Sequence, residues 1–215
     1  DGHPVQLLAN IGTAADARKA AAQDVEGVGL FRSEFLFLDR DTAPTVDEQT
    51  ATYTEVLEAF GDRKVVVRTL DAGADKPLAF ADLGHEENPA LGRRGIRLGA
   101  VRTDLLDDQL QALANAYQAT NANLWVMAPM IATRQEAAWF AELVRAKGLP
   151  KDGVMLEVPA AALRSCDVLS EVDFASLGTN DLGQYTMAAD RMQGELAELL
   201  NPWQPALLDV IYYAC

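Results

Sequence analysis

Six short apolar runs recur along the chain, separated by longer segments with helical periodicity. The runs are rich in valine and leucine and apolar on both faces, which is typical of strands buried on both sides of a parallel sheet. Strands that alternate with helices in this way predict an α/β fold whose helices cross back over a parallel sheet. The runs begin near Val5, Gly27, Lys64, Leu124, Gly153 and Phe174.

The segments between the runs carry signals for helix starts. Thr13 is a suitable N-cap for an alanine-rich segment, and the Thr-Val-Asp-Glu sequence from Thr45 has the capping-box pattern. Two connections, over residues 33–45 and 71–92, are longer than usual, and the second is expected to contain a small hairpin around Leu78 to Phe80. Helices are expected over residues 13–23, 45–60, 103–117, 133–147, 160–165 and 205–214.

The number of strands bears on the type of sheet. A TIM-type (β/α)₈ barrel has eight strands, usually in about 250 residues, whereas six can be counted in these 215 residues. No linker, repeat or low-complexity segment divides the chain. We therefore expect one domain over residues 1–215, a TIM-type barrel truncated to about six βα units and incomplete on its C-terminal side. The open edges of its first and last strands would promote association.

Composition and charge exclude several classes of protein. The net charge of −14 argues against a nucleic-acid partner. Thirteen of the 18 basic residues are arginine, which suits planar recognition of phosphate or carboxylate groups. The sequence has neither a signal peptide nor a run of about 18 apolar residues, so we expect a cytoplasmic protein without membrane insertion.

Charged residues directly follow several of the apolar runs, at the strand ends where parallel α/β folds bind ligands. Arg32 and Arg68 each follow such a run. They could pair with nearby carboxylates such as Glu34 and Asp71, or they could hold an anion. Arg94, in a glycine-rich turn, adds a third arginine cluster. Several guanidinium groups that face one pocket would repel one another without a multiply charged anion, which favours phosphate.

Two carboxylates form a second group. Glu157 follows an apolar run and precedes Val-Pro, so its charge needs a cation or hydrogen-bond donors. Asp181 follows Asn180 in a strand-to-helix turn, where it could equally be a helix-capping residue. Two carboxylates from neighbouring strands suit Mg²⁺. Arg191 and Lys76 are ambiguous, since a surface ion pair would explain either.

Several ordered motifs resemble the phosphoenolpyruvate (PEP)-utilising enzymes, and in detail the PEP-protein phosphotransferases, Enzyme I of the sugar phosphotransferase system. The resemblance covers essentially the whole chain. The run from Thr69 to Lys76, and Gln184 to Thr186 with Arg191, point to that branch. The family motifs are residues 29–37, 67–71, 87–94, 155–161 and 178–182.

The resemblance implies a PEP-binding (β/α)₈ domain. In the family, arginines that match Arg32, Arg68 and Arg191 hold the phosphate group. The arginine that matches Arg94 lies near the enolpyruvate, and the residue that matches Asn180 contacts phosphate. These five residues are therefore the expected substrate-binding set.

The resemblance also implies a metal and protein partners. Carboxylates that match Glu157 and Asp181 bind Mg²⁺ in the family. The phosphoryl group passes from PEP to a histidine on a separate N-terminal domain and then to a phosphocarrier protein during sugar uptake. The family's barrel domains form homodimers.

The sequence departs from the family in ways that affect activity. The proton-donating cysteine of a Cys-Gly-Glu motif and the phosphohistidine domain have no counterpart here, and Val158 and Gly183 replace threonines. No catalytic residue of the family is therefore present, and we expect this chain alone to be inactive. The alternatives are another PEP-utilising enzyme, such as pyruvate phosphate dikinase or PEP synthase, or a non-catalytic module for PEP binding or dimerisation.

Overall fold

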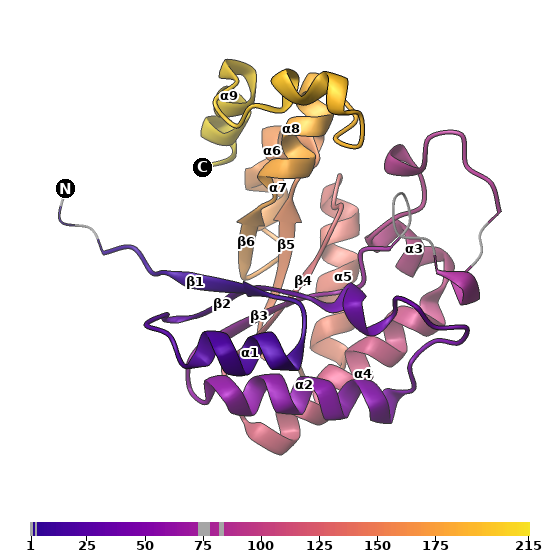
Figure 1. Ribbon diagram of the computed structural model, residues 1–215, viewed down its shortest axis with the longest axis vertical. Helices are drawn as coiled ribbons and strands as arrows, with labels where there is room; N and C mark the ends of the chain where they lie inside the picture. Colours follow the sequence, from indigo (N-terminus) through magenta and orange to yellow (C-terminus); the bar gives the residue numbers. More distant parts are fainter. Residues whose placement is uncertain (1, 3, 73–77, 82–83) are drawn as a thin grey trace.

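The computed structural model describes residues 2, 4–72, 78–81 and 84–215. Its strands form a single parallel sheet that follows chain order and curls as it proceeds, as Figure 1 shows. The predicted α/β class and the six parallel strands are confirmed, in the form of an open, curled part of a barrel. The strands are β1 (Leu8–Ile11), β2 (Gly27–Arg32), β3 (Lys64–Arg68), β4 (Leu124–Ala128), β5 (Asp152–Leu156) and β6 (Phe174–Leu177).

The helices lie mostly between successive strands. The main ones are α1 (Ala14–Ala21), α2 (Val46–Phe60), α3 (Ile96–Val101), α4 (Thr103–Thr120) and α5 (Arg134–Ala146). Those towards the C-terminus are α6 (Pro159–Leu163), α7 (Ser165–Leu169), α8 (Thr179–Met187) and α9 (Pro205–Ala214). Four short 3₁₀ segments complete the described elements: η1 (Ser33–Leu36), η2 (Ala79–Ala81), η3 (Pro89–Leu91) and η4 (Gly194–Leu200).

Local sequence explains where the long helices begin. Thr13, Thr45 and Thr133 each cap a helix in a complete capping box. The threonine side chain accepts from the backbone N–H three positions later, and the acidic side chain of that residue accepts from the threonine N–H. The boxes at Thr13 and Thr45 confirm the expected helix starts. Each satisfies backbone N–H groups that the first helical turn leaves without a partner.

Two local expectations are wrong. The first strand begins at Leu8 rather than near Val5, because its parallel pairing begins with Leu8 opposite Gly27 and leaves Val5 86% exposed. The expected hairpin is also not formed in the described part of residues 71–92, where the 3₁₀ segments η2 and η3 stand instead. The apolar and polar residues that alternate weakly near Leu78 do not form a strand in the described part of this connection.

The two faces of the sheet have different neighbours. Val65 and Val67 of β3 face the main core, which the outer helices complete. Val66, between them, lies on the other face in a small cluster with Met127 and Met155. This alternation follows from the two-residue period of a strand. The inner face is thus apolar below the carboxyl ends of the strands, where the charged side chains gather.

Candidate functional site

A cavity of about 510 Å³ lies at the carboxyl ends of the strands. Four arginines and four carboxylates line it, together with Asn180 at its exposed rim. All seven site residues expected from the sequence therefore lie around one space. The charged lining residues are Arg32, Arg68, Arg94, Arg191, Glu34, Asp71, Glu157 and Asp181.

Arg68 ends β3 and is buried between two carboxylates. Its Nη2 lies 2.7 Å from Glu34 Oε1 and its Nη1 lies 3.2 Å from Asp71 Oδ2. Burial lowers the pKa of Arg68, but the negative charges of Asp71 and Glu34 outweigh it and raise that pKa, so the guanidinium stays charged. The local pairing expected as one alternative for Arg68 is thus present, and Arg68 still lines the cavity.

Arg32 occupies the equivalent position on the neighbouring strand, directly opposite Arg68 in the parallel register. Its guanidinium lies over the ring of Phe35, 5.2 Å from the ring centroid. Among the described residues no carboxylate forms an ion pair with it, and its buried Nε has no hydrogen-bond partner. Arg32 therefore brings positive charge to the cavity that no protein carboxylate in the described ranges neutralises directly.

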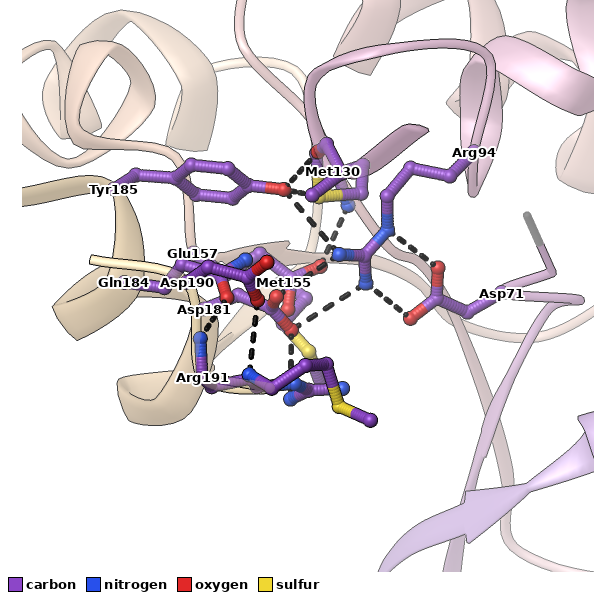
Figure 2. A network of polar contacts seen from close by, with 12 residues as sticks. Asp71, Arg94, Met130, Met155, Glu157, Asp181, Gln184, Tyr185, Asp190 and Arg191 are labelled. Carbon is purple, nitrogen blue, oxygen red and sulfur yellow. Dashed lines mark hydrogen bonds and ion pairs between the residues drawn. The ribbon is translucent and has the colours of Figure 1, made fainter. Parts of the chain in front are cut away.

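Arg94 precedes α3 and is held by all five of its N–H groups (Figure 2). Nε and Nη2 donate to the two oxygens of Asp71 at 3.3 and 2.9 Å. Nη1 and Nη2 donate to Asp181 at 2.9 and 3.4 Å, and Nη1 also donates to the hydroxyl of Tyr185 at 3.2 Å. Burial lowers its pKa, but Asp71 and Asp181 more than compensate and raise it. The next residue, Gly95, has a φ of +57°, which favours glycine.

Glu157 follows β5 and is 1% exposed. Its Oε1 accepts a hydrogen bond of 2.7 Å from the amide of Met130. Burial, followed by the charges of Asp71 and Asp181, raises the pKa of Glu157 to about 8, against the opposing effect of Arg68. A carboxylate whose charged form is disfavoured in this way is a group that a cation would stabilise.

The turn after β6 brings a second carboxylate towards Glu157. A side chain at Gly178 would place its Cβ only 2.7 Å from Glu157 Oε2, so the close approach requires glycine. α8 begins directly afterwards and carries Asp181 in its first turn, where a carboxylate is favoured by the helix dipole. Arg191 follows this helix, and its Nη1 lies 3.7 Å from Asp181 Oδ2.

The donor chemistry of the site fits Mg²⁺. Glu157 and Asp181 supply hard carboxylate oxygens, and Mg²⁺ commonly uses one or two carboxylates and takes its other ligands from water and substrate. Within the described ranges no three His, Cys, Asp or Glu side chains are grouped as a ready-made metal cage. Asp181 is bonded to Arg94 here, so metal binding would require that carboxylate to change partners.

Three further residues shape the site and were not assigned a role from the sequence. Glu34 and Asp71 were expected only as neighbours of the strand-end arginines, yet Asp71 bridges Arg68 and Arg94. Tyr185 contacts Arg94 from α8. Its position four residues after Asp181 places both on one helix face, which is the signal that could have revealed it. Lys76, whose role the sequence left open, lies outside the described residues.

Comparison with known proteins identifies the family of this chain. A parallel sheet with a charged cavity at the carboxyl ends of its strands is the arrangement of barrel enzymes that act on small anions. The family model "PEP-utilising enzyme, PEP-binding domain" matches residues 1–215. The chain therefore belongs to the PEP-utilising enzymes.

Its curated relatives define the branch of the family and confirm the resemblance seen in the sequence. PEP-protein phosphotransferase of Streptomyces coelicolor is 56% identical over 98% of this chain and 38% of the relative. Those of Haloferax volcanii and Bacillus subtilis are 48% and 46% identical over 98% of this chain and 40% and 39% of the relatives. The chain thus spans about two fifths of the length of these proteins.

Some solved structures are distantly similar to this chain. The crystal structure of 2,3-dimethylmalate lyase covers 80% of this chain and 65% of its own with a TM-score of 0.38 and 13% identity, a likeness too weak to carry an argument. None of the helices in the described ranges has the length and apolar character that a membrane crossing requires.

Proposed function

We propose that this cavity binds PEP together with Mg²⁺, as part of a protein that transfers the phosphoryl group of PEP. The observation that carries the proposal is that two arginines from adjacent strand ends, Arg32 and Arg68, share one cavity with the buried carboxylate of Glu157. An anion and a cation therefore have complementary partners in the same space. Membership of the PEP-utilising enzymes supports PEP as that anion.

The charge balance supports joint binding of substrate and metal. Four arginines and four carboxylates line the cavity, so their charges cancel when all are ionised. A phosphate ester carries a charge of about −1.5 to −2 at neutral pH, and the carboxylate of PEP adds one more. Such a ligand gains little from a neutral lining unless a cation enters with it.

The residues divide into two sets of partners. We expect Arg32, Arg68 and Arg191 to hold the phosphate, with Arg94 near the enolpyruvate and Asn180 donating to a phosphate oxygen. Arginine suits these positions because its fork of N–H donors matches phosphate and carboxylate oxygens.

Glu157 and Asp181 are the expected Mg²⁺ ligands. The ion, when bound, would neutralise charge on the substrate oxygens. Two carboxylates leave most of its coordination to water and substrate.

For the whole protein we propose transfer of the phosphoryl group to a histidine of an N-terminal domain and onward to a phosphocarrier protein. The sequence of this chain holds neither that domain nor the Cys-Gly-Glu motif, so we expect it to bind PEP without transferring phosphate. We also propose a homodimer. Trp203 and Tyr212, which are 76% and 79% exposed, lie on the C-terminal segment as aromatic surface that a partner could cover.

Titration calorimetry of PEP with and without Mg²⁺ tests the proposal. We expect binding that depends on Mg²⁺ and that weakens at least about tenfold in Glu157→Gln, since the amide is a poor Mg²⁺ ligand. The amide oxygen can still accept the bond from Met130, so the thermal midpoint should hold. Glu142→Gln makes the same change on the exposed face of α5 and should bind like wild type. Binding that ignores Mg²⁺, or that survives Glu157→Gln, would contradict the assignment.

A further inference from the structure

Tyr185 connects three separate parts of the chain beside the cavity. It projects from α8, and its hydroxyl donates to the carbonyl of Ala90 in η3. The same oxygen accepts a hydrogen bond from Arg94 Nη1 at 3.2 Å and lies 3.8 Å from the sulfur of Met130. Figure 2 shows the ring reaching across to the Arg94 guanidinium from the side opposite Asp71.

The hydroxyl has one proton to donate, so its contacts have a definite direction. The carbonyl of Ala90 takes that proton, while the sulfur of Met130 is a packing neighbour. The lone pairs of the hydroxyl remain to accept the Arg94 N–H. The hydroxyl of Tyr185 therefore contacts the chain twice within a few residues. It donates to the backbone at Ala90, and it accepts from the side chain of Arg94.

Arg94 depends on this contact for its orientation. Asp71 holds Nε and Nη2, on one edge of the guanidinium, and Asp181 and Tyr185 hold Nη1. Tyr185 is the neutral member of this set. If Asp181 turns to Mg²⁺, as the proposed function requires, Tyr185 is the described side chain that still accepts a bond from Nη1.

A second cavity lies beside Tyr185. It has a volume of about 650 Å³, and its wall includes Tyr185, Pro89 and Met192. Arg94 and Arg191 line both this space and the charged cavity. Arg94 therefore borders open space besides the charged cavity, and its bond to the hydroxyl of Tyr185 lies at that border.

We propose that Tyr185 is a positioning residue that keeps Arg94 directed into the charged cavity when Asp181 is engaged by the metal. The proposal rests on the proposed function for the use of Arg94 as a ligand of PEP. Its structural core, the restraint of Arg94 by one hydroxyl, can be measured without any ligand.

Tyr185→Phe removes the hydroxyl and keeps the ring. The matched control is Tyr53→Phe, which also removes one tyrosine hydroxyl. That hydroxyl is hydrogen-bonded to the side chains of Gln49 and Gln109 behind the sheet, away from Arg94. The first measurement is the exchange rate of the Arg94 Nη protons with water by ¹⁵N NMR, because Nη1 is the group that donates to Tyr185; their signals are identified with Arg94→Lys. The second is PEP affinity in the presence of Mg²⁺.

We expect Tyr185→Phe to speed exchange at Arg94 several-fold and to weaken PEP binding about tenfold, the loss typical of a hydrogen bond to a charged group. Tyr53→Phe should change neither. Unchanged exchange at Arg94 in Tyr185→Phe, or equal changes in both variants, would overturn the positioning role. If wild type binds no PEP, the proposed function fails, while the exchange measurement still decides whether Tyr185 restrains Arg94.

Discussion

Two polar networks meet at the ends of β2 and β3, and they are built on opposite principles. The neutral hub lies behind the sheet and consists of Ser33, Gln49, Tyr53 and Gln109. The charged cluster lies in the cavity and consists of Glu34, Arg68, Asp71, Arg94, Glu157 and Asp181. The two are adjacent in sequence at Ser33 and Glu34, yet they face different surroundings.

The neutral hub satisfies its donors and acceptors internally. Gln109 Oε1 accepts from the amide of Leu70 at 2.8 Å, and its Nε2 donates to Ser33 Oγ at 2.9 Å and to the hydroxyl of Tyr53 at 2.8 Å. Ser33 Oγ in turn donates to the carbonyl of Arg68 at 2.7 Å. A buried network of this kind stabilises one arrangement of the strand ends, since each bond broken leaves a buried polar group without a partner.

The charged cluster, in contrast, holds a carboxylate whose charged form is disfavoured. Burial, followed by the charges of Asp71 and Asp181, raises the pKa of Glu157, whereas the side chains of the hub are uncharged groups. The comparison indicates a division of labour: the hub stabilises the strand ends, while the cluster, in which four carboxylates outnumber two arginines, can accept a cation. Variants that separate stability from binding can test it.

We expect the largest loss of unfolding free energy for Arg68→Met. Glu34 and Asp71 would each lose an ion pair with Arg68, and removing one partner from a buried ion pair costs about 3–5 kcal/mol of unfolding free energy. Urea unfolding followed by circular dichroism measures it. Arg32→Met is the matched control on the adjacent strand, because Arg32 forms no ion pair within the described ranges; it should unfold like wild type and lose PEP affinity. Similar unfolding of the two variants would show that the buried ion pairs of Arg68 contribute little to stability.

Gln109→Leu should have the next largest effect. It leaves the amide of Leu70 and the hydroxyls of Ser33 and Tyr53 without their shared partner, and we expect a loss of about 3 kcal/mol in unfolding free energy. Gln118→Leu makes the same change at an exposed position of α4 and should stay within about 0.5 kcal/mol of wild type. Loss of PEP binding in Gln109→Leu without loss of stability would show that the hub serves the ligand instead.

Ligand addition should act through the cluster alone. PEP with Mg²⁺ at about a hundred times the dissociation constant should raise the unfolding free energy by about 2.7 kcal/mol. We expect that increment in wild type and in the hub variants, and its loss in Glu157→Gln or after chelation of Mg²⁺. Thermal unfolding with and without both ligands provides the measurement. An increment in unfolding free energy that remains after chelation would contradict the proposed role of Mg²⁺ in PEP binding.

Tyr53→Phe should give the smallest effect, a loss of about 1 kcal/mol, since one hydroxyl leaves the hub while its ring stays packed against Phe31. The exposed Tyr212→Phe is its control and should unfold at the same urea concentration as wild type. A Tyr53→Phe variant with wild-type stability would mean that the hub adds less than its bond pattern indicates.

Much of the site was predictable because parallel strands place their carboxyl ends at one edge of the sheet. The positions of Arg32, Arg68 and Glu157 follow from the apolar runs that precede them, and the capping boxes follow from residues three positions apart. These signals are local, so the chain carries them without reference to the fold. Arg94 stood out by its glycine-rich turn, while the family motifs gave Arg94 and Asn180 their expected roles and turned the ambiguous Arg191 into a member of the same set.

The partners of these residues could not be read in the same way. Arg94 contacts Asp71, Asp181 and Tyr185, which lie 23, 87 and 91 positions away along the chain. The hub likewise joins Gln109 to Ser33 across 76 positions. Only the stacking of helices behind the sheet and the curl of the strands decide which of many polar side chains meet.

The sequence by itself determined the α/β class, the order of the strands, the helix caps and the edge at which charge collects, because periodicity and capping act over a few residues. The tertiary structure decided that Glu157 is buried near Asp71 and Asp181, that Arg94 has every N–H engaged, and that Arg94 lines two cavities. These properties depend on burial and on distances between segments far apart in the chain. Electrostatic and hydrogen-bond energies change steeply with both, so they exist only once the sheet has curled and the loops have closed over its end.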